Sequence, residues 1–383
     1  MPSSSPSVPD ETSPSPRLDR AAIQAIVASG RRLLVQGAMG IHASDGIAGK
    51  VAGHRGARLV GVGTISAVLK TSDHLRSEIR RAKLEAPGGY VGVNLMAAIN
   101  KADFEAHARL AIEEKVSFIV QGAGISREIV RWCREGGVPF AGIVSSGRLA
   151  AMYEKWGADF IVAEGAEAGG HIGDIGHPLP ALNAEVLAAT SLPVVAAGGV
   201  DASDVVRFLA AGAAGVQMAT RFLACSDGDV HPAFKEMHLG KSADDVTIIT
   251  SCVKGMNARA VRNAFTDRLA RGEAIPPRSK AWWFGKDGYM GRRKACVECL
   301  GEAVCKCRAS GFKESFCITD ALLAAAIVGD VEHGLFYTGQ SLVRIGEQTL
   351  AELPTVAEIL GSLEARLAAD EKIHVAAGHE AAA

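Results

Sequence analysis

The sequence predicts an α/β protein, a TIM (β/α)8 barrel followed by a smaller C-terminal helical domain. Eight short apolar segments alternate with amphipathic segments between Leu33 and Met218, as in parallel strands joined by right-handed helical crossovers. The chain has 383 residues, enough for a barrel of about 250 residues and a further domain. No Gly-x-Gly-x-x-Gly motif follows the first strand, which disfavours an open dinucleotide-binding sheet.

The expected elements follow from two periodicities. Short apolar runs bounded by turn residues indicate buried strands, and apolar residues at three- and four-residue spacing indicate helices. The strands are expected at residues 33–35, 58–62, 90–95, 117–121, 139–144, 158–162, 193–197 and 215–218. The helices are expected at residues 19–29, 72–84, 101–114, 126–135, 147–156, 183–190, 202–211 and 231–239.

The composition divides the chain into five parts. Residues 1–18 are rich in Ser and Pro and are expected to be a disordered leader. Residues 19–245 are expected to form the barrel. Residues 246–350 are expected to form a helical lid or substrate domain, with its helical region starting over 251–263 and a cysteine-rich segment further on. Residues 351–368 are expected to form a closing helix, and residues 369–383 a frayed tail.

Charge and hydropathy argue against several classes of partner. The net charge of −1 disfavours binding to nucleic acid or to an anionic membrane surface. No apolar run reaches the roughly 18 residues of a membrane-spanning helix. The N-terminus also lacks the apolar core of a signal peptide. The predicted location is therefore the cytoplasm, where thiols are kept reduced.

Most of the eight cysteines are clustered near the C-terminus. Cys296, Cys299, Cys305, Cys307 and Cys317 form this cluster, and such a group of thiols can hold zinc or an iron–sulfur cluster. The spacing matches neither paired Cys-x2-Cys arrays nor the ferredoxin run, and no histidine lies within the cluster. We therefore expect reduced structural thiols and no metal site.

A glycine-rich stretch around His171 is the strongest candidate for a catalytic centre. The segment from Ala163 to Gly173 follows the sixth strand and places His171 directly after Gly169-Gly170. Catalytic groups of a barrel lie at the carboxyl ends of its strands, and a histidine can exchange a proton near neutral pH. His171 is therefore predicted to be a general base or acid.

Small residues after most of the other strands predict a cofactor site at the same end of the barrel. Gly198-Gly199 follows the seventh strand, and Ala219-Thr220 follows the eighth. The last two βα loops of a barrel commonly bind phosphate through backbone N–H groups and a helix N-terminus. We therefore expect a phosphate group at these two loops, with the Thr220 hydroxyl as an additional ligand.

These motifs resemble those of the flavin-dependent nitronate monooxygenase (2-nitropropane dioxygenase) family, which includes the FMN-type enoyl-acyl-carrier-protein reductases. The resemblance runs from about Leu33 to Leu360. Its most specific segments are Glu-Ala-Gly-Gly-His at 167–171, Ala-Ala-Gly-Gly-Val at 196–200, Gln-Met-Ala-Thr-Arg-Phe at 217–222 and Gly-Asp-Val-Glu-His-Gly-Leu at 329–335. Members are TIM barrels with a smaller helical domain and bind FMN noncovalently at the strand C-termini. The family usually has Gly-Thr where this chain has Ala219-Thr220.

The resemblance implies a role for each matching residue. It identifies His171 as the catalytic base or proton donor. The residues implied to bind FMN are Gln36, Gly37, Ala38 and Met39 along the flavin ring, Asn94 and Gln121 as polar ring contacts, Gly169 and Gly170 beside the cofactor, and Gly198, Gly199, Ala219 and Thr220 around its phosphate. Glu164 and Gln217 are also expected to bind the cofactor. No residue is expected to bind a metal.

Three functions remain open. The first is an FMN-dependent oxidoreductase that oxidises alkyl nitronates with O2. The second is an FMN-dependent enoyl-thioester reductase that uses NAD(P)H; His171 could serve as base or acid in either reaction. The third is a non-catalytic sensor that binds flavin or, through its cysteines, a metal. The expected partners are a small-molecule or acyl-thioester substrate together with O2 or NAD(P)H, and a homodimer is left open.

Overall fold

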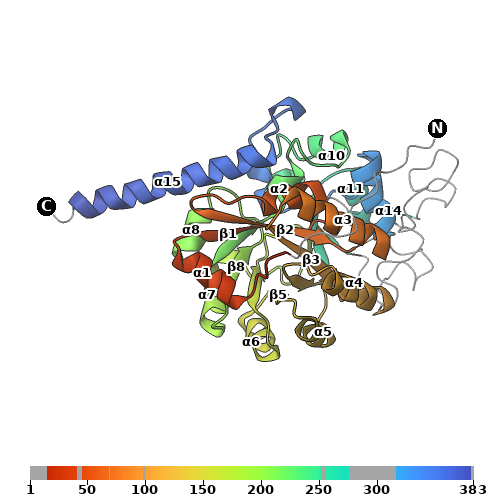
Figure 1. Cartoon of the computed structure of the whole chain (residues 1–383). Helices are drawn as coiled ribbons and strands as arrows, with labels where there is room; N and C mark the ends of the chain where they lie inside the picture. The colour runs from red at the N-terminus through yellow and green to blue at the C-terminus, as the bar shows by residue number, and fades with distance from the viewer. Residues whose placement is uncertain are drawn as a thin grey trace.

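The computed structural model describes residues 15–40, 45–68, 70–97, 101–251, 256–273, 275 and 316–380. Within them, eight parallel strands close into a barrel in the order β1-β2-β3-β4-β5-β6-β8-β9 (Figure 1). The strands are β1 (Arg32–Gln36), β2 (Leu59–Ser66), β3 (Tyr90–Met96), β4 (Ile119–Gly122), β5 (Phe140–Val144), β6 (Phe160–Glu164), β8 (Val194–Ala197) and β9 (Gly215–Met218). The predicted barrel and all of its predicted strands are confirmed, and β2 continues beyond its expected end to Ser66.

Helices connect the strands and cover the outside of the barrel (Figure 1). They are α1 (Arg20–Ala28), α2 (Asp45–Ala52), α3 (Ser72–Glu85), α4 (Lys101–Glu113), α5 (Glu128–Gly136), α6 (Gly147–Trp156), α7 (Leu179–Ala189), α8 (Val205–Ala210), α9 (Thr220–Leu223) and α10 (Pro232–Glu236). The sequence does not predict α2, because its two glycines disfavour a helix. One of them is needed for packing: a Cβ at Gly49 would lie 2.6 Å from the Cβ of Glu85 in α3.

The interior of the barrel is filled by side chains from alternate strand positions. Phe118 and Phe160 belong to this inner cluster, and their rings meet edge to face with centroids 5.4 Å apart. Leu18 belongs to the same cluster and donates its backbone N–H to the carbonyl oxygen of Ser117 at 2.9 Å. The expected leader over residues 1–18 is therefore wrong at Leu18, which is fully buried at the N-terminal end of the barrel. Residues 1–14 lie outside the described part of the chain.

A second, antiparallel sheet lies beside the barrel mouth. It has the order β10-β11-β7 and consists of β10 (Val246–Thr250), β11 (Asn257–Val261) and the short β7 (Gly170–Ile172). The expected helical region over 251–263 is wrong for β11. Alanine and arginine favour helices in isolation, but pairing on both sides and burial of Ala258 and Ala260 make this segment a strand.

Helices make up most of the remaining described C-terminal part. They are α11 (Ala264–Ala270), α14 (Ile318–Leu323) and α15 (Val356–Glu380). The first turns of α15 pack on the barrel through Val356, Ile359 and Leu363, and the helix then projects away from the barrel (Figure 1). The frayed tail expected from residue 369 is wrong up to Glu380, because the segment is rich in strong helix formers. No helix in the described ranges combines the length and the apolarity needed to cross a membrane.

The cysteine-rich segment lies mostly outside the described residues. Cys296, Cys299, Cys305 and Cys307 are not among them, whereas Cys317 is partly buried and directly precedes α14. The described residues contain no group of three or more His, Cys, Asp or Glu side chains arranged to hold a metal ion. The metal-free state of the cluster, and the domain boundaries at residues 245 and 350, remain predictions.

Candidate active site

A cavity of about 240 Å³ lies at the carboxyl ends of the barrel strands. It brings together every predicted site residue except Gln36 and Gln121. The predicted residues that line it are Gly37, Ala38, Met39, Asn94, Glu164, Gly169, Gly170, His171, Gly198, Gly199, Gln217, Ala219 and Thr220. Other residues that line it come from β2, β3, α9, α14 and the segment 337–341. The rim motifs of distant strands therefore form one site, as expected for a barrel.

Gln36 and Gln121 are fully buried outside the cavity lining. The Gln36 amide donates to the carbonyl oxygen of Gly37 at 2.5 Å and accepts the N–H of Thr64 at 3.1 Å. The amide oxygen of Gln121 accepts the N–H of Ser126 at 2.7 Å, and its nitrogen donates to the Tyr153 hydroxyl at 3.1 Å. Both amides are therefore engaged by the protein itself, and their implied contacts with a flavin ring stay predictions.

Strand alternation explains which side chains reach the cavity. Successive residues of a strand point to opposite faces. Val120 belongs to the inner cluster, so its neighbour Gln121 faces outward. Val162 also belongs to the inner cluster, so Glu164, two residues later, faces inward and lines the cavity. The same rule, applied to the sequence, would have assigned Gln36 to the outer face.

His171 lies on β7, which is outside the barrel sheet and pairs with β11. Its Nε2 lies 2.7 Å from the hydroxyl oxygen of Ser251. The ring of Tyr337 meets the imidazole edge to face, with centroids 5.7 Å apart. Burial lowers the pKa of His171 to about 4, so the imidazole is neutral at physiological pH and can accept a proton.

Glu164 is the acidic group of the cavity. It ends β6 on the inward-facing side of the strand. Burial raises the pKa of its carboxyl to about 7, and no Lys or Arg is found among the described residues that line the cavity. A carboxyl with this pKa is partly protonated at neutral pH, so it can donate as well as accept a hydrogen bond.

The turn after β8 requires glycine. Gly198 and Gly199 have φ values of +99° and +66°, in the left-handed region that glycine enters at little cost. A Cβ at Gly199 would also lie 2.5 Å from the Cβ of Glu167. Arg344 holds this turn by donating to the carbonyl oxygen of Gly199 at 2.5 Å and by pairing with Asp204 at 2.9 Å. Sequence reasoning missed Arg344, which lies far from the turn in the chain.

The segment 337–341 lines the cavity next to Thr220. The hydroxyl oxygen of Thr220 accepts the backbone N–H of Gly339 at 2.9 Å. A Cβ at Gly169 would lie 2.5 Å from the carbonyl carbon of Thr338, so the two backbones touch directly. Thr220 therefore holds a protein segment at the cavity as well as lining it.

Arg259 is a further residue that the sequence did not single out. Its guanidinium is buried and donates from Nη1 to the carbonyl oxygens of Ala166 and Ala168, at 2.5 and 2.6 Å. Burial lowers its pKa, which the nearby Glu167 partly offsets. The one available signal was a charged residue inside the otherwise small and apolar run Ala258-Arg259-Ala260-Val261.

Comparisons with known proteins are consistent with this architecture. Residues 28–365 match the family model described as nitronate monooxygenase. A (3aS,4S,5R,7aS)-5-hydroxy-7a-methyl-1-oxo-octahydro-1H-indene-4-carboxyl-CoA dehydrogenase from Mycobacterium tuberculosis is 32% identical over 227 residues, which cover 57% of this chain. A Staphylococcus aureus protein named "Probable nitronate monooxygenase" is 30% identical over 224 residues, or 56% of this chain. The two matches span 62% and 61% of those relatives.

Solved structures match over nearly the whole chain. FabK from Thermotoga maritima has 26% sequence identity and a TM-score of 0.72, and the match covers 94% of this chain and 98% of FabK. Nitroalkane oxidase from Streptomyces ansochromogenes has 22% identity and a TM-score of 0.67, with 89% and 96% covered. At that identity the second match shows only the shared fold.

Proposed function

Because this chain belongs to the nitronate monooxygenase family, we propose that it binds FMN noncovalently and oxidises alkyl nitronates with O2. It is an oxidoreductase of a flavoenzyme family. That the flavin is FMN, that the substrate is an alkyl nitronate and that O2 accepts the electrons is proposed. The cytoplasm remains the predicted location.

The residues at the cavity fit FMN. The turn at Gly198-Gly199 lines the cavity and has left-handed backbone at both residues. No described residue accepts a hydrogen bond from the backbone N–H groups of Gly198, Gly199 or Thr220, and such groups suit a phosphate. Asn94, Glu164 and Gln217 supply polar atoms to the same cavity, and these could bond the polar edge of a flavin ring. These residues would hold the cofactor.

The observation that carries the choice of reaction is the neutral state of His171. When bound, FMN supplies the electron transfer between substrate and O2. An unprotonated imidazole can take the α-proton of a neutral nitroalkane and so form the nitronate. It can also donate a hydrogen bond from its remaining N–H. With a pKa of about 4, the imidazole of His171 is unprotonated at neutral pH, which is the state that a general base must have before it reacts.

An enoyl-thioester reductase is the second candidate. The coverage of the match to FabK supports it, as does the carboxyl-CoA substrate in the name of the Mycobacterium tuberculosis relative. A reductase must deliver a proton to its reduced substrate. Burial disfavours the imidazolium of His171, which makes it a poor stored acid, although Glu164 could hold a proton at neutral pH. We therefore place this activity second.

Anaerobic flavin reduction tests the proposal. The purified protein, loaded with FMN, is mixed without O2 with a freshly prepared alkyl nitronate, the parent nitroalkane, NADH or NADPH. Bleaching by the nitronate, followed by recovery when O2 is admitted, is the expected result. Bleaching by NAD(P)H alone, with recovery on an enoyl thioester, would establish the reductase instead. A protein that takes up no flavin but holds stoichiometric metal would support the sensor hypothesis.

A further inference from the structure

Ser251 is the described residue that shares a hydrogen bond with the imidazole of His171. It directly follows β10, is 1% exposed, and donates its backbone N–H to the carbonyl oxygen of Met256 at 3.0 Å. That bond extends the β10–β11 pairing by one step. Because β11 also pairs with β7, the same sheet places the Ser251 hydroxyl 2.7 Å from Nε2 of His171. Both partners are therefore fixed by backbone pairing.

The two nitrogens of His171 have different surroundings. Nε2 is held by Ser251, whereas Nδ1 has no hydrogen-bond partner among the described residues. His171 lines the cavity, and Nδ1 is the ring nitrogen that no described residue engages. A neutral imidazole carries its proton on one nitrogen only, and the partner of one nitrogen sets the state of the other.

We propose that Ser251 is a positioning residue that accepts the Nε2–H of His171 and so keeps Nδ1 unprotonated toward the cavity. The proposal rests on the proposed role of His171 as a base. In the proton transfer, the Cα–H bond of a neutral nitroalkane breaks and its proton forms a bond to Nδ1. The electron pair of that bond enters the carbon–nitrogen bond of the resulting nitronate. Ser251 continues to accept from Nε2–H in the imidazolium.

A serine oxygen differs from a carboxylate in this position. It is uncharged, so it orients the ring without adding the Coulombic attraction that would raise the pKa of His171. In agreement with this, burial is the cause of the shift at His171, and the pKa of the imidazole is lowered, not raised. Ser251 therefore orients the imidazole of His171, whereas burial sets its protonation state.

The tautomer can be measured without turnover. Protein labelled with 15N-histidine is studied by long-range 1H–15N correlation at neutral pH, and His171→Ala identifies the resonances of His171. The Nε2–H tautomer is expected in the parent, with a shift toward the other tautomer in Ser251→Ala. A parent that carries its proton on Nδ1, or a Ser251→Ala spectrum identical to that of the parent, would overturn the proposal.

Kinetics provide the second test. Loss of one hydrogen bond predicts about tenfold lower kcat/KM for Ser251→Ala with a neutral nitroalkane. With fresh nitronate, which needs no deprotonation, kcat/KM should stay within about twofold, and Ser251→Thr should restore nitroalkane activity. Thr250→Ala, which removes an exposed hydroxyl next in the chain, is the matched control. Equal losses with both substrates, at full FMN content, would contradict the proposal.

The two experiments distinguish two failures. If the parent accepts neither nitroalkane nor nitronate, the proposed function is wrong, and the tautomer measurement still decides whether Ser251 orients His171. If the parent is active but its tautomer does not respond to Ser251→Ala, the proposed function stands and the positioning role is wrong.

Discussion

The Nη1 atom of Arg259 lies 2.6 Å from the carbonyl oxygen of Ala168. A side chain of β11 thus holds the loop that leads into β7 and His171. The same nitrogen also bonds the carbonyl oxygen of Ala166, so one buried guanidinium organises the turn between β6 and β7. The catalytic candidate therefore depends on a residue that makes no contact with the cavity.

Replacing Arg259 with Met should destabilise the protein. Two buried carbonyl oxygens would lose their donor, and each unsatisfied group costs about 1–3 kcal/mol. Equilibrium urea unfolding of the apoprotein measures the change. Arg262→Met, at an exposed position one residue beyond the same strand, is the control and should stay within about 0.5 kcal/mol. Equal stabilities of the two variants would show that Arg259 does not hold the loop.

Gly199→Ala should weaken FMN binding. Its φ of +66° disfavours any side chain, and a Cβ would lie 2.5 Å from the Cβ of Glu167. The turn must shift, and we expect the dissociation constant for FMN to rise at least about tenfold, as for a loss of roughly 1.4 kcal/mol. Fluorescence titration of the apoprotein measures it. Gly346→Ala, where a Cβ meets nothing within 4 Å, should bind FMN like the parent.

His171→Ala should lower turnover while FMN remains bound. General acid–base catalysis is typically worth about 10²–10⁴-fold, and the loss should be larger for a neutral nitroalkane than for a nitronate. Steady-state and single-turnover kinetics, with flavin content measured alongside, provide the test. His333→Ala serves as the control, because this side chain is 51% exposed. Flavin reduction at the parent rate with every accepted substrate would make His171 a structural residue.

Glu164→Gln should stabilise the apoprotein selectively at higher pH. The folded carboxyl has a pKa of about 7, against 4.5 as the ordinary value. Between these values the folded state holds a proton that the unfolded state has released, so the free energy of unfolding falls as pH rises. Glu164→Gln has no carboxyl at this position, so its free energy of unfolding does not fall for this reason as pH rises. The melting temperature of Glu164→Gln minus that of the parent should therefore increase between pH 4.5 and pH 8.

An exposed carboxylate provides the control for that pH series. The side chain of Glu135 is 65% exposed, so the difference in melting temperature between Glu135→Gln and the parent should change little with pH. A flat difference for Glu164→Gln as well would mean that the Glu164 carboxyl is ionised over the whole range in the folded protein.

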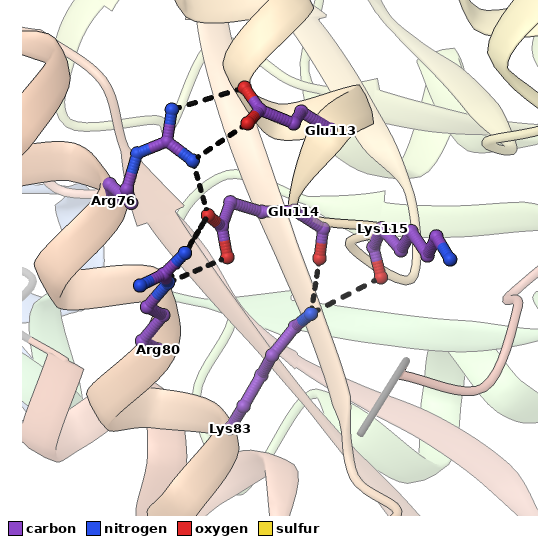
Figure 2. A network of polar contacts seen from close by, with 6 residues as sticks. All are labelled: Arg76, Arg80, Lys83, Glu113, Glu114 and Lys115. Carbon is purple, nitrogen blue, oxygen red and sulfur yellow. Dashed lines mark hydrogen bonds and ion pairs between the residues drawn. The ribbon is translucent and has the colours of Figure 1, made fainter. Parts of the chain in front are cut away.

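Glu114→Gln should destabilise the outer helical layer. Figure 2 shows the Glu114 carboxylate between Arg76 and Arg80 of α3, with bonds of 2.6 and 3.0 Å. The Glu114 side chain is 5% exposed, and a lost charged partner there costs about 1–3 kcal/mol. Glu113→Gln is the matched control, because Glu113 also pairs with Arg76 but is 65% exposed. It should cost less than about 1 kcal/mol by the same urea unfolding, and equal costs would contradict the argument.

The barrel could be predicted from the sequence because its signals are local. Each strand is a short apolar run, and the spacers have helical periodicity, so neighbouring residues carry the information. The glycines at 198–199 marked the tight turn after β8 for the same reason. Strand alternation, which is also local, would even have excluded Gln36 and Gln121 from the cavity.

Tertiary structure decided what surrounds His171. Ser251 is 80 residues away in the chain, and Arg344 is 145 residues from Gly199; no local pattern links such pairs. β11 has the composition of a helix, and only pairing with β7 and β10 makes it a strand. Burial, which depends on the whole fold, then lowers the pKa of His171 and raises that of Glu164. The sequence alone determined the barrel and most residues of its rim, whereas long-range pairing and desolvation decided their protonation and their partners.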